Sequence, residues 1–261
     1  MNALEADNVH HEYRTTSGVL KVLDGVSFSL GSKEIATILG PSGCGKSTLL
    51  QCLAGLMKPT CGSITIFGNS PERCLAAKEV GYAFQQPSLL PWLTVRENVT
   101  LPARLGRKVL QNGEVEVRAA DLIQMLNLNE AASSYPDELS VGMQHRVALA
   151  RSLLVPSKVL YLDEPLAGLD LLTRMEIMIQ MVRVFEHFAC PTVIVTHSIE
   201  EAVFWGSRIL ILSAKPSHIS SVLMNPQRAS DRTLSYLDSP VFHELIAECR
   251  ATLFKSQSSN V

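Results

Sequence analysis

One short run of residues limits the possible folds of this chain more than any other. Residues 40–48 read GPSGCGKST and match the pattern G-x-x-x-x-G-K-[ST] in full. The run follows Ile35–Leu39, a predicted strand, and it opens Lys46–Leu56, where leucines recur at helical spacing. A strand that turns through glycines into a helix is the setting in which this motif binds phosphate. A glycine-rich turn without a ligand is the weaker interpretation.

The residue types in this run suit a polyphosphate. Glycines let backbone N–H groups turn toward the β-phosphate, and the helix N-terminus adds its positive end. Lys46 supplies a charge to the β- and γ-phosphates, and the Ser47 hydroxyl can ligate Mg²⁺. The whole run is therefore expected to bind nucleotide, through Gly40, Ser42, Gly43, Cys44, Gly45, Lys46, Ser47 and Thr48.

A second stretch, Val159–Glu164, is an apolar predicted strand that ends in two carboxylates. Asp163 is placed to hold Mg²⁺ through water, and Glu164 to polarise an attacking water. Two acids at a strand end could also simply begin the next turn, but the phosphate loop upstream weakens that alternative.

Predicted strands alternate with predicted helices along most of the chain, which indicates an α/β sheet covered on both faces. The further strands are expected at Leu20–Leu30, Ser63–Phe67, Val80–Phe84, Thr192–Thr196 and Arg208–Leu212, and the further helices at Leu172–Phe188, Ile199–Trp205 and Pro240–Leu253. Residues 94–154 turn helical and predict a subdomain inserted into a core of residues 1–93 and 155–215. Residues 216–261 are then expected to form a short C-terminal extension.

Composition narrows the possible partners. The formal net charge is -2, so there is no basic surplus of the kind that indicates a nucleic-acid partner. The longest apolar runs are strand-sized, and the acidic start lacks the apolar region of a secretory signal. The six cysteines show no Cys-x-x-Cys spacing, which favours reduced thiols in a cytosolic protein.

Several short motifs, in a fixed order, carry a family resemblance that runs from about Leu4 to Leu212. Residues 139–143 read LSVGM and lie between the two nucleotide motifs, and DEP at 163–165 is followed by AGLD at 167–170. Gln85 follows the predicted strand Val80–Phe84, and His197 follows the predicted strand Thr192–Thr196. Tyr13 precedes the first predicted strand of the chain, Leu20–Leu30. Together they resemble the nucleotide-binding domain of ATP-binding-cassette (ABC) proteins. The resemblance implies a P-loop NTPase fold with a mixed core sheet, an antiparallel β subdomain and an inserted helical subdomain.

The resemblance also implies roles for residues outside the phosphate loop. Tyr13 would stack on adenine, and Gln85 would touch Mg²⁺ or the lytic water. His197 would hold the γ-phosphate, so that Glu164, His197, Lys46 and Gln85 are the expected catalytic residues and Ser47, Gln85 and Asp163 the expected metal ligands. Ser140 and Gly142 would contact ATP bound by a second subunit, across an interface that also includes Asp170, and an identical second chain is expected.

The family pattern has glycine where this chain has Val141. Valine adopts helical dihedrals, but it adds volume where the other subunit's phosphate approaches. Either its side chain points aside at little cost, or it weakens the composite site. The intact motifs elsewhere favour the first interpretation.

Residues Gln85–Val99 combine prolines, leucines and Trp92 in what is expected to be an apolar loop. On composition alone, a locally buried connection is an equal alternative. The resemblance favours a docking site for a polytopic membrane permease, because the run LLPW is similar to ATPases of nitrate, sulfonate and taurine importers. It implies an ATPase at the cytoplasmic face of the inner membrane that powers uptake of a small anion, with an extracytoplasmic solute-binding protein as an indirect partner.

Two alternatives to this function remain. The chain could be the ATPase of an importer of thiamine precursors, or an ABC ATPase outside import that acts in lipid trafficking or is associated with DNA.

Overall fold

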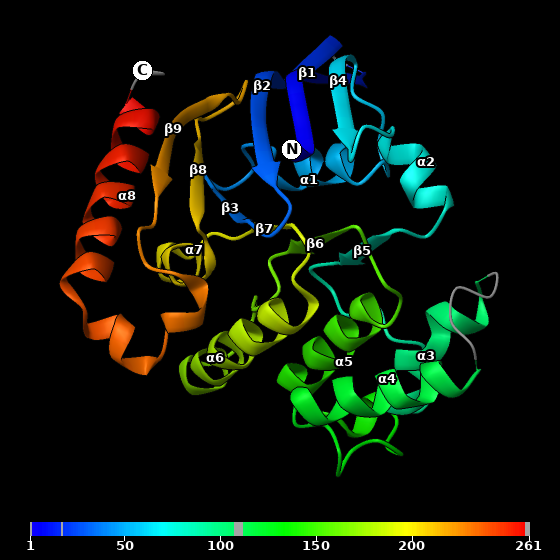
Figure 1. Cartoon of the computed structure of the whole chain (residues 1–261). Helices are drawn as coiled ribbons and strands as arrows, with labels where there is room; N and C mark the ends of the chain where they lie inside the picture. The colour runs from blue at the N-terminus through cyan, green and yellow to red at the C-terminus, as the bar shows by residue number, and fades with distance from the viewer. Residues whose placement is uncertain (1, 17, 107–111, 259–261) are drawn as a thin grey trace.

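The computed structural model describes residues 2–16, 18–106 and 112–258. Two sheets organise the chain (Figure 1). The larger sheet has the strand order β5-β6-β7-β3-β8-β9 and consists of β3 (Ile35–Leu39), β5 (Val80–Ala83), β6 (Val159–Asp163), β7 (Thr192–Val195), β8 (Arg208–Leu212) and β9 (Ile219–Met224). Its first five strands in this order are parallel, and β9 pairs antiparallel with β8. The expected mixed core sheet is confirmed.

The smaller sheet is antiparallel and has the order β2-β1-β4, formed by β1 (Asn2–Thr15), β2 (Gly18–Gly31) and β4 (Cys61–Ile66). It is the expected antiparallel subdomain. The sequence did not predict β1, because register shifts interrupt its alternation: Ala3 and Leu4 are both buried although they are neighbours. It also did not predict β9, whose Ser220 and Ser221 dilute the apolar pattern.

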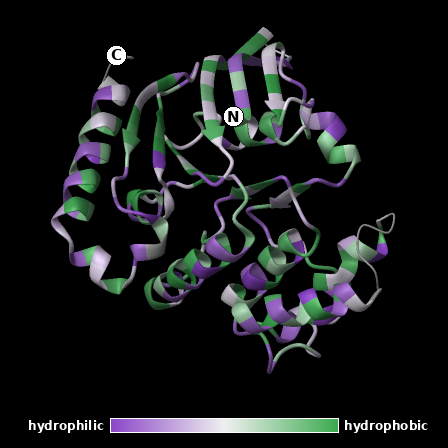
Figure 2. Ribbon diagram, in the orientation of Figure 1, coloured by the Kyte–Doolittle hydropathy of each residue, from purple (hydrophilic) through white to green (hydrophobic). Residues whose placement is uncertain are grey.

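Three layers result from the alternation of side chains along the core strands. In β3, Ala36 and Ile38 face one way and pack with α1 (Lys46–Leu53) and the smaller sheet, whereas Ile35 and Leu39 face the other helices. These are α6 (Leu171–Phe188), α7 (Ile199–Trp205) and α8 (Pro240–Ser258). The short α2 (Pro71–Ala76) lies beside β4, with the smaller sheet. Helix α8 shows alternating green and purple bands in Figure 2, as expected of a helix that buries one face.

Between β5 and β6 the chain forms the expected helical insertion, which lies at the lower right of Figure 1. It consists of α3 (Val95–Arg104), α4 (Asn112–Met125), the short 3-10 turn η1 (Pro136–Glu138) and α5 (Val141–Leu153). The C-terminal segment carries two further 3-10 turns, η2 (Ala229–Asp231) and η3 (Leu234–Asp238). No helix among the described residues is both long and apolar enough to cross a membrane.

A nucleotide cleft at the carboxyl ends of four strands

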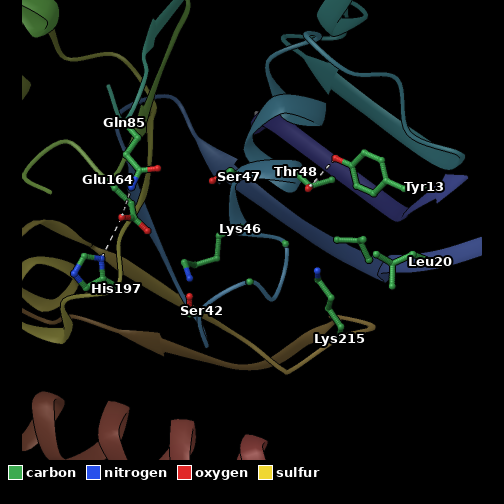
Figure 3. A pocket seen from close by; sticks show the side chains of 13 residues that line it. Tyr13, Leu20, Ser42, Lys46, Ser47, Thr48, Gln85, Glu164, His197 and Lys215 are labelled. Atoms are coloured by element: carbon green, nitrogen blue, oxygen red, sulfur yellow. Dashed lines mark hydrogen bonds and ion pairs between the residues drawn. The ribbon is translucent and has the colours of Figure 1, made fainter. Parts of the chain in front are cut away.

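Most of the predicted site residues meet because four adjacent parallel strands end at one edge of the larger sheet. Gln85 follows β5, Glu164 follows β6, His197 follows β7, and the phosphate loop follows β3, in the spatial order β5-β6-β7-β3. In open α/β sheets this edge is the usual place of a ligand site. Residues that are far apart in sequence therefore surround one cleft of about 730 Å³ (Figure 3).

The loop between β3 and α1 adopts a conformation that needs glycine. Gly45 has a φ of 112° and caps the N-terminus of α1, and a Cβ there would lie 2.5 Å from Val22. Gly43 has a φ of 71° with open space around it. Backbone N–H groups at the start of α1 thus face the cleft, which favours an anion.

Lys46 is nearly buried, at 6% exposed, and its ammonium is held inside the loop. Its Nζ donates to the carbonyl oxygens of Gly40, at 2.9 Å, and Pro41, at 3.0 Å. No carboxylate of the described residues pairs with it, so its positive charge remains available to an anion in the cleft. This is the arrangement that a polyphosphate requires.

Two oxygen ligands suited to Mg²⁺ lie side by side. The Ser47 hydroxyl donates to Asp163 Oδ1 at 3.0 Å, and the Tyr82 hydroxyl lies 3.5 Å from Asp163 Oδ2. Asp163 is only 5% exposed, and burial raises the pKa of its carboxyl group, an effect that the bond from Ser47 partly opposes. A hydroxyl and a carboxylate are hard donors, so these residues fit the predicted magnesium site.

Glu164 is the centre of a second cluster. Gln85 Nε2 donates to Glu164 Oε2 at 3.1 Å, and His197 Nδ1 lies 3.2 Å from the same oxygen. Glu164 has a φ of 47°, an uncommon conformation outside glycine, and its backbone N–H donates to the Val195 carbonyl. The end of β7 therefore holds the backbone of Glu164, and its carboxylate points into the cleft (Figure 3).

Tyr13 lines the opposite side of the cleft, where its hydroxyl lies 3.1 Å from that of Thr48. Leu20 and Val22 from β2 complete an apolar surface beside it. Sequence reasoning selected Tyr13 but not these two residues, and it did not select Lys215, which also lines the cleft. Only the pairing of β2 with β1 and the path of the chain after β8 bring these three residues to the site.

Ser140 and Gly142 do not line this cleft. Ser140 is exposed and caps α5 by accepting a hydrogen bond from the Met143 N–H. Gly142 is buried, and a Cβ there would lie 2.7 Å from Thr173 of α6, so glycine allows the two helices to approach. Val141, between them, is 55% exposed, so its side chain adds no volume to the core.

We predict that Asp163→Asn raises the free energy of unfolding of the nucleotide-free protein at pH 7. Because burial raises the pKa of Asp163, ionisation at pH 7 costs more in the folded than in the unfolded chain. The amide avoids this cost and still accepts the bond from Ser47. The gain should disappear as the pH falls below the ordinary pKa of 3.8, because the carboxyl group is then protonated in both states. Urea unfolding at pH 7 and at about pH 3 measures it.

Asp170→Asn is the matched control, with the opposite sign. Hydrogen bonds from the Thr173 side chain and from backbone N–H groups lower the pKa of Asp170, so its ionised form stabilises the fold at pH 7. Its replacement should therefore lower stability. A change of the same sign in both variants would contradict the assignment of a buried, costly charge to Asp163.

Comparison with known proteins agrees with this site. Residues 23–167 match the family model for the ABC transporter. The aliphatic sulfonates import ATP-binding protein SsuB of Bacillus thuringiensis subsp. konkukian (strain 97-27) is 35% identical over 242 residues, which cover 91% of this chain and 94% of the relative. The taurine import ATP-binding protein TauB of Rhizobium johnstonii (strain DSM 114642 / LMG 32736 / 3841) is 36% identical over 241 residues, 90% of each chain.

A solved structure is also similar to most of this chain. The dimeric post-hydrolysis state of the ATP-binding cassette MJ0796, bound to ADP and Pi, matches with a TM-score of 0.75 and 30% identity, covering 86% of this chain and 100% of that one. The fold, the nucleotide cleft and these relatives lead to one conclusion. The chain belongs to the ABC transporter family and is one of its ATPase subunits.

Proposed function

We propose that this chain hydrolyses ATP to drive an importer of a small anion, of the sulfonate or taurine kind. The observation that carries the ATPase mechanism is the carboxylate of Glu164, which Gln85 and His197 hold at 3.1 and 3.2 Å in a cleft lined by Lys46 and Ser47. The names of the relatives support the choice of solute. An importer of thiamine precursors remains the second candidate, because solute specificity in such systems lies in other subunits.

In the proposed mechanism the phosphate loop and Lys46 bind the β- and γ-phosphates, and Tyr13 supports the adenine. Ser47 and Asp163, with Gln85, would hold Mg²⁺, which neutralises charge on the phosphates. Glu164 accepts a hydrogen bond from the attacking water, and His197 stabilises charge on the transferred phosphoryl group. Gln85 and His197 both contact Glu164 Oε2, which supports these roles because the contact keeps Glu164 and His197 together before substrate arrives.

We propose that a second chain completes the site. Ser140 begins a helix at an exposed surface, where its N-terminus is free to approach an anion of another subunit. Helix α5 also contacts the loop that follows Glu164, because His145 Nδ1 lies 3.1 Å from the Pro165 carbonyl oxygen. We propose that two identical chains sandwich two nucleotides, with residues 94–154 as the subdomain that carries this helix to the partner.

A groove between β5 and the helices α3 and α5, which borders the Gln85–Val99 segment but is not lined by it, supports permease docking. It has a volume of about 540 Å³ and is mostly apolar, and its lining comprises Leu56, Leu75, Lys78, Val80, Gly81, Tyr82, Phe84, Leu101, Pro102, Leu105, Arg151, Ser152, Val155 and Ser157. Arg151 also donates to the carbonyls of Pro87 and Ser88, which holds the loop after Gln85. On that loop Trp92 is 69% exposed. A peripheral position at the cytoplasmic face of the inner membrane would follow from docking here.

We expect Glu164→Gln to reduce ATP turnover about a hundredfold or more while ATP still binds. The amide keeps the size of the side chain but cannot accept a proton from water, so a closed dimer should accumulate. Phosphate release measures turnover, and size-exclusion chromatography with ATP detects the dimer. Glu72→Gln, an exposed change on α2, serves as the control. Unchanged turnover would remove Glu164 from the role of base.

Val141→Gly should leave the ATPase rate similar or raise it. The Val141 side chain is exposed, so its removal opens no cavity, and Ser140 still caps α5. The rate should be compared at saturating ATP, with thermal unfolding as a check on folding. A large fall in rate would show that the valine contributes to the composite site.

Leu105→Asp should weaken binding to the permease by about tenfold or more, the effect typical of an anchor in a docking groove. Leu105 is 71% exposed at the end of α3, so folding and nucleotide binding should be unchanged. The measurement is the fraction of chain that sediments with permease-containing membranes. Leu234→Asp, at another exposed leucine, is the matched control, and equal sedimentation of both variants would argue against docking in this groove.

A further inference from the structure

A lysine outside all the recognised motifs lines the nucleotide cleft. Lys215 lies on the turn between β8 and β9. In Figure 3 its side chain is directed into the cleft between the loop that carries Ser42 and the Leu20 side chain of β2. It lies away from Glu164 and His197, on the side of the cleft where Leu20 lies.

The turn that carries Lys215 is fastened to the phosphate loop. Ser217 is fully buried, and its hydroxyl donates to the carbonyl oxygen of Cys44. The Ser217 N–H donates to the Val22 carbonyl at 2.8 Å, and the Asp24 N–H donates to the Ser217 carbonyl at 2.8 Å. Lys215 lies two residues before Ser217 in the sequence. Its backbone position is therefore fixed relative to the anion-binding loop, unlike that of a lysine on a free surface turn.

The charge of Lys215 also acts on the phosphate loop. Burial raises the pKa of the Cys44 thiol, and Lys46 and Lys215 are among the groups that oppose this rise. Within the described residues no carboxylate pairs with the Lys215 ammonium. An unpaired cation at this place lies next to a loop that already favours an anion.

We propose that Lys215 binds the α- and β-phosphates of the nucleotide, as a second cation beside Lys46. The position away from Glu164 and His197 assigns it to these phosphates and not to the γ-phosphate. Lys46 is nearly buried within the loop, whereas Lys215 approaches from the exposed side of the cleft. This inference rests on nucleotide binding in the cleft, as the proposed function does.

The test is the affinity of the full-length Lys215→Gln protein for ADP and ATP, measured by calorimetry with Mg²⁺ in the Glu164→Gln background so that ATP persists. We expect both affinities to fall by about threefold to tenfold at low salt, and the difference to shrink at high salt. Lys215→Arg should keep most of the affinity. Lys33→Gln, at an exposed lysine in the turn before β3, should change nothing.

Two results would overturn this role of Lys215. The first is an affinity of Lys215→Gln within about twofold of the parent for both nucleotides. The second is a loss confined to ATP or to ATP-driven dimerisation, which would place the lysine at the γ-phosphate or the second subunit. The Lys46→Ala variant distinguishes failure of the Lys215 proposal from failure of the proposed function. If the parent binds no nucleotide, or binds it independently of Lys46, the proposed function fails; if only the Lys215 effect is missing, only this inference fails.

Discussion

The register of four parallel strands is the constraint on which the rest of this structure depends. Strands β5, β6, β7 and β3 lie side by side, so the residues after them share one edge of the sheet. A shift of one strand by a single residue would turn its buried side chains to the opposite face, so core packing fixes the register. The same packing that holds Leu160 and Ile194 in the core therefore also sets the distances around Glu164.

The two neighbouring acids at the end of β6 illustrate how position separates chemical roles. Asp163 is the last residue of the strand and lies almost buried beside Ser47, where its charge costs stability but suits a metal ion. Glu164, one residue later, has a left-handed backbone conformation that turns its carboxylate into the cleft toward Gln85 and His197. Adjacent carboxylates thus lie in different environments because the strand ends between them.

Two glycines, Gly45 and Gly142, are required for different physical reasons. Gly45 permits a backbone angle that other residues rarely adopt, and it brings the start of α1 close to β2. Gly142 instead makes room for Thr173, so that α5 packs against α6. The glycine of the helix that we propose to reach a second subunit therefore also has a packing role within its own chain. The packing role explains why a side chain is tolerated at the exposed Val141 position more readily than at Gly142.

The sequence by itself determined the phosphate loop, the acids at the end of a strand, the alternation of strands and helices, and the family. These features are local, because a tight glycine turn or an apolar strand is encoded in a few consecutive residues. Tertiary structure alone decided that β1 and β9 exist, that Leu20 and Val22 lie beside Tyr13, and that Lys215 enters the cleft. Irregular strands carry weak periodicity, and Lys215 reaches the cleft because Ser217 fastens its turn to Cys44 and to β2, which are far away in sequence.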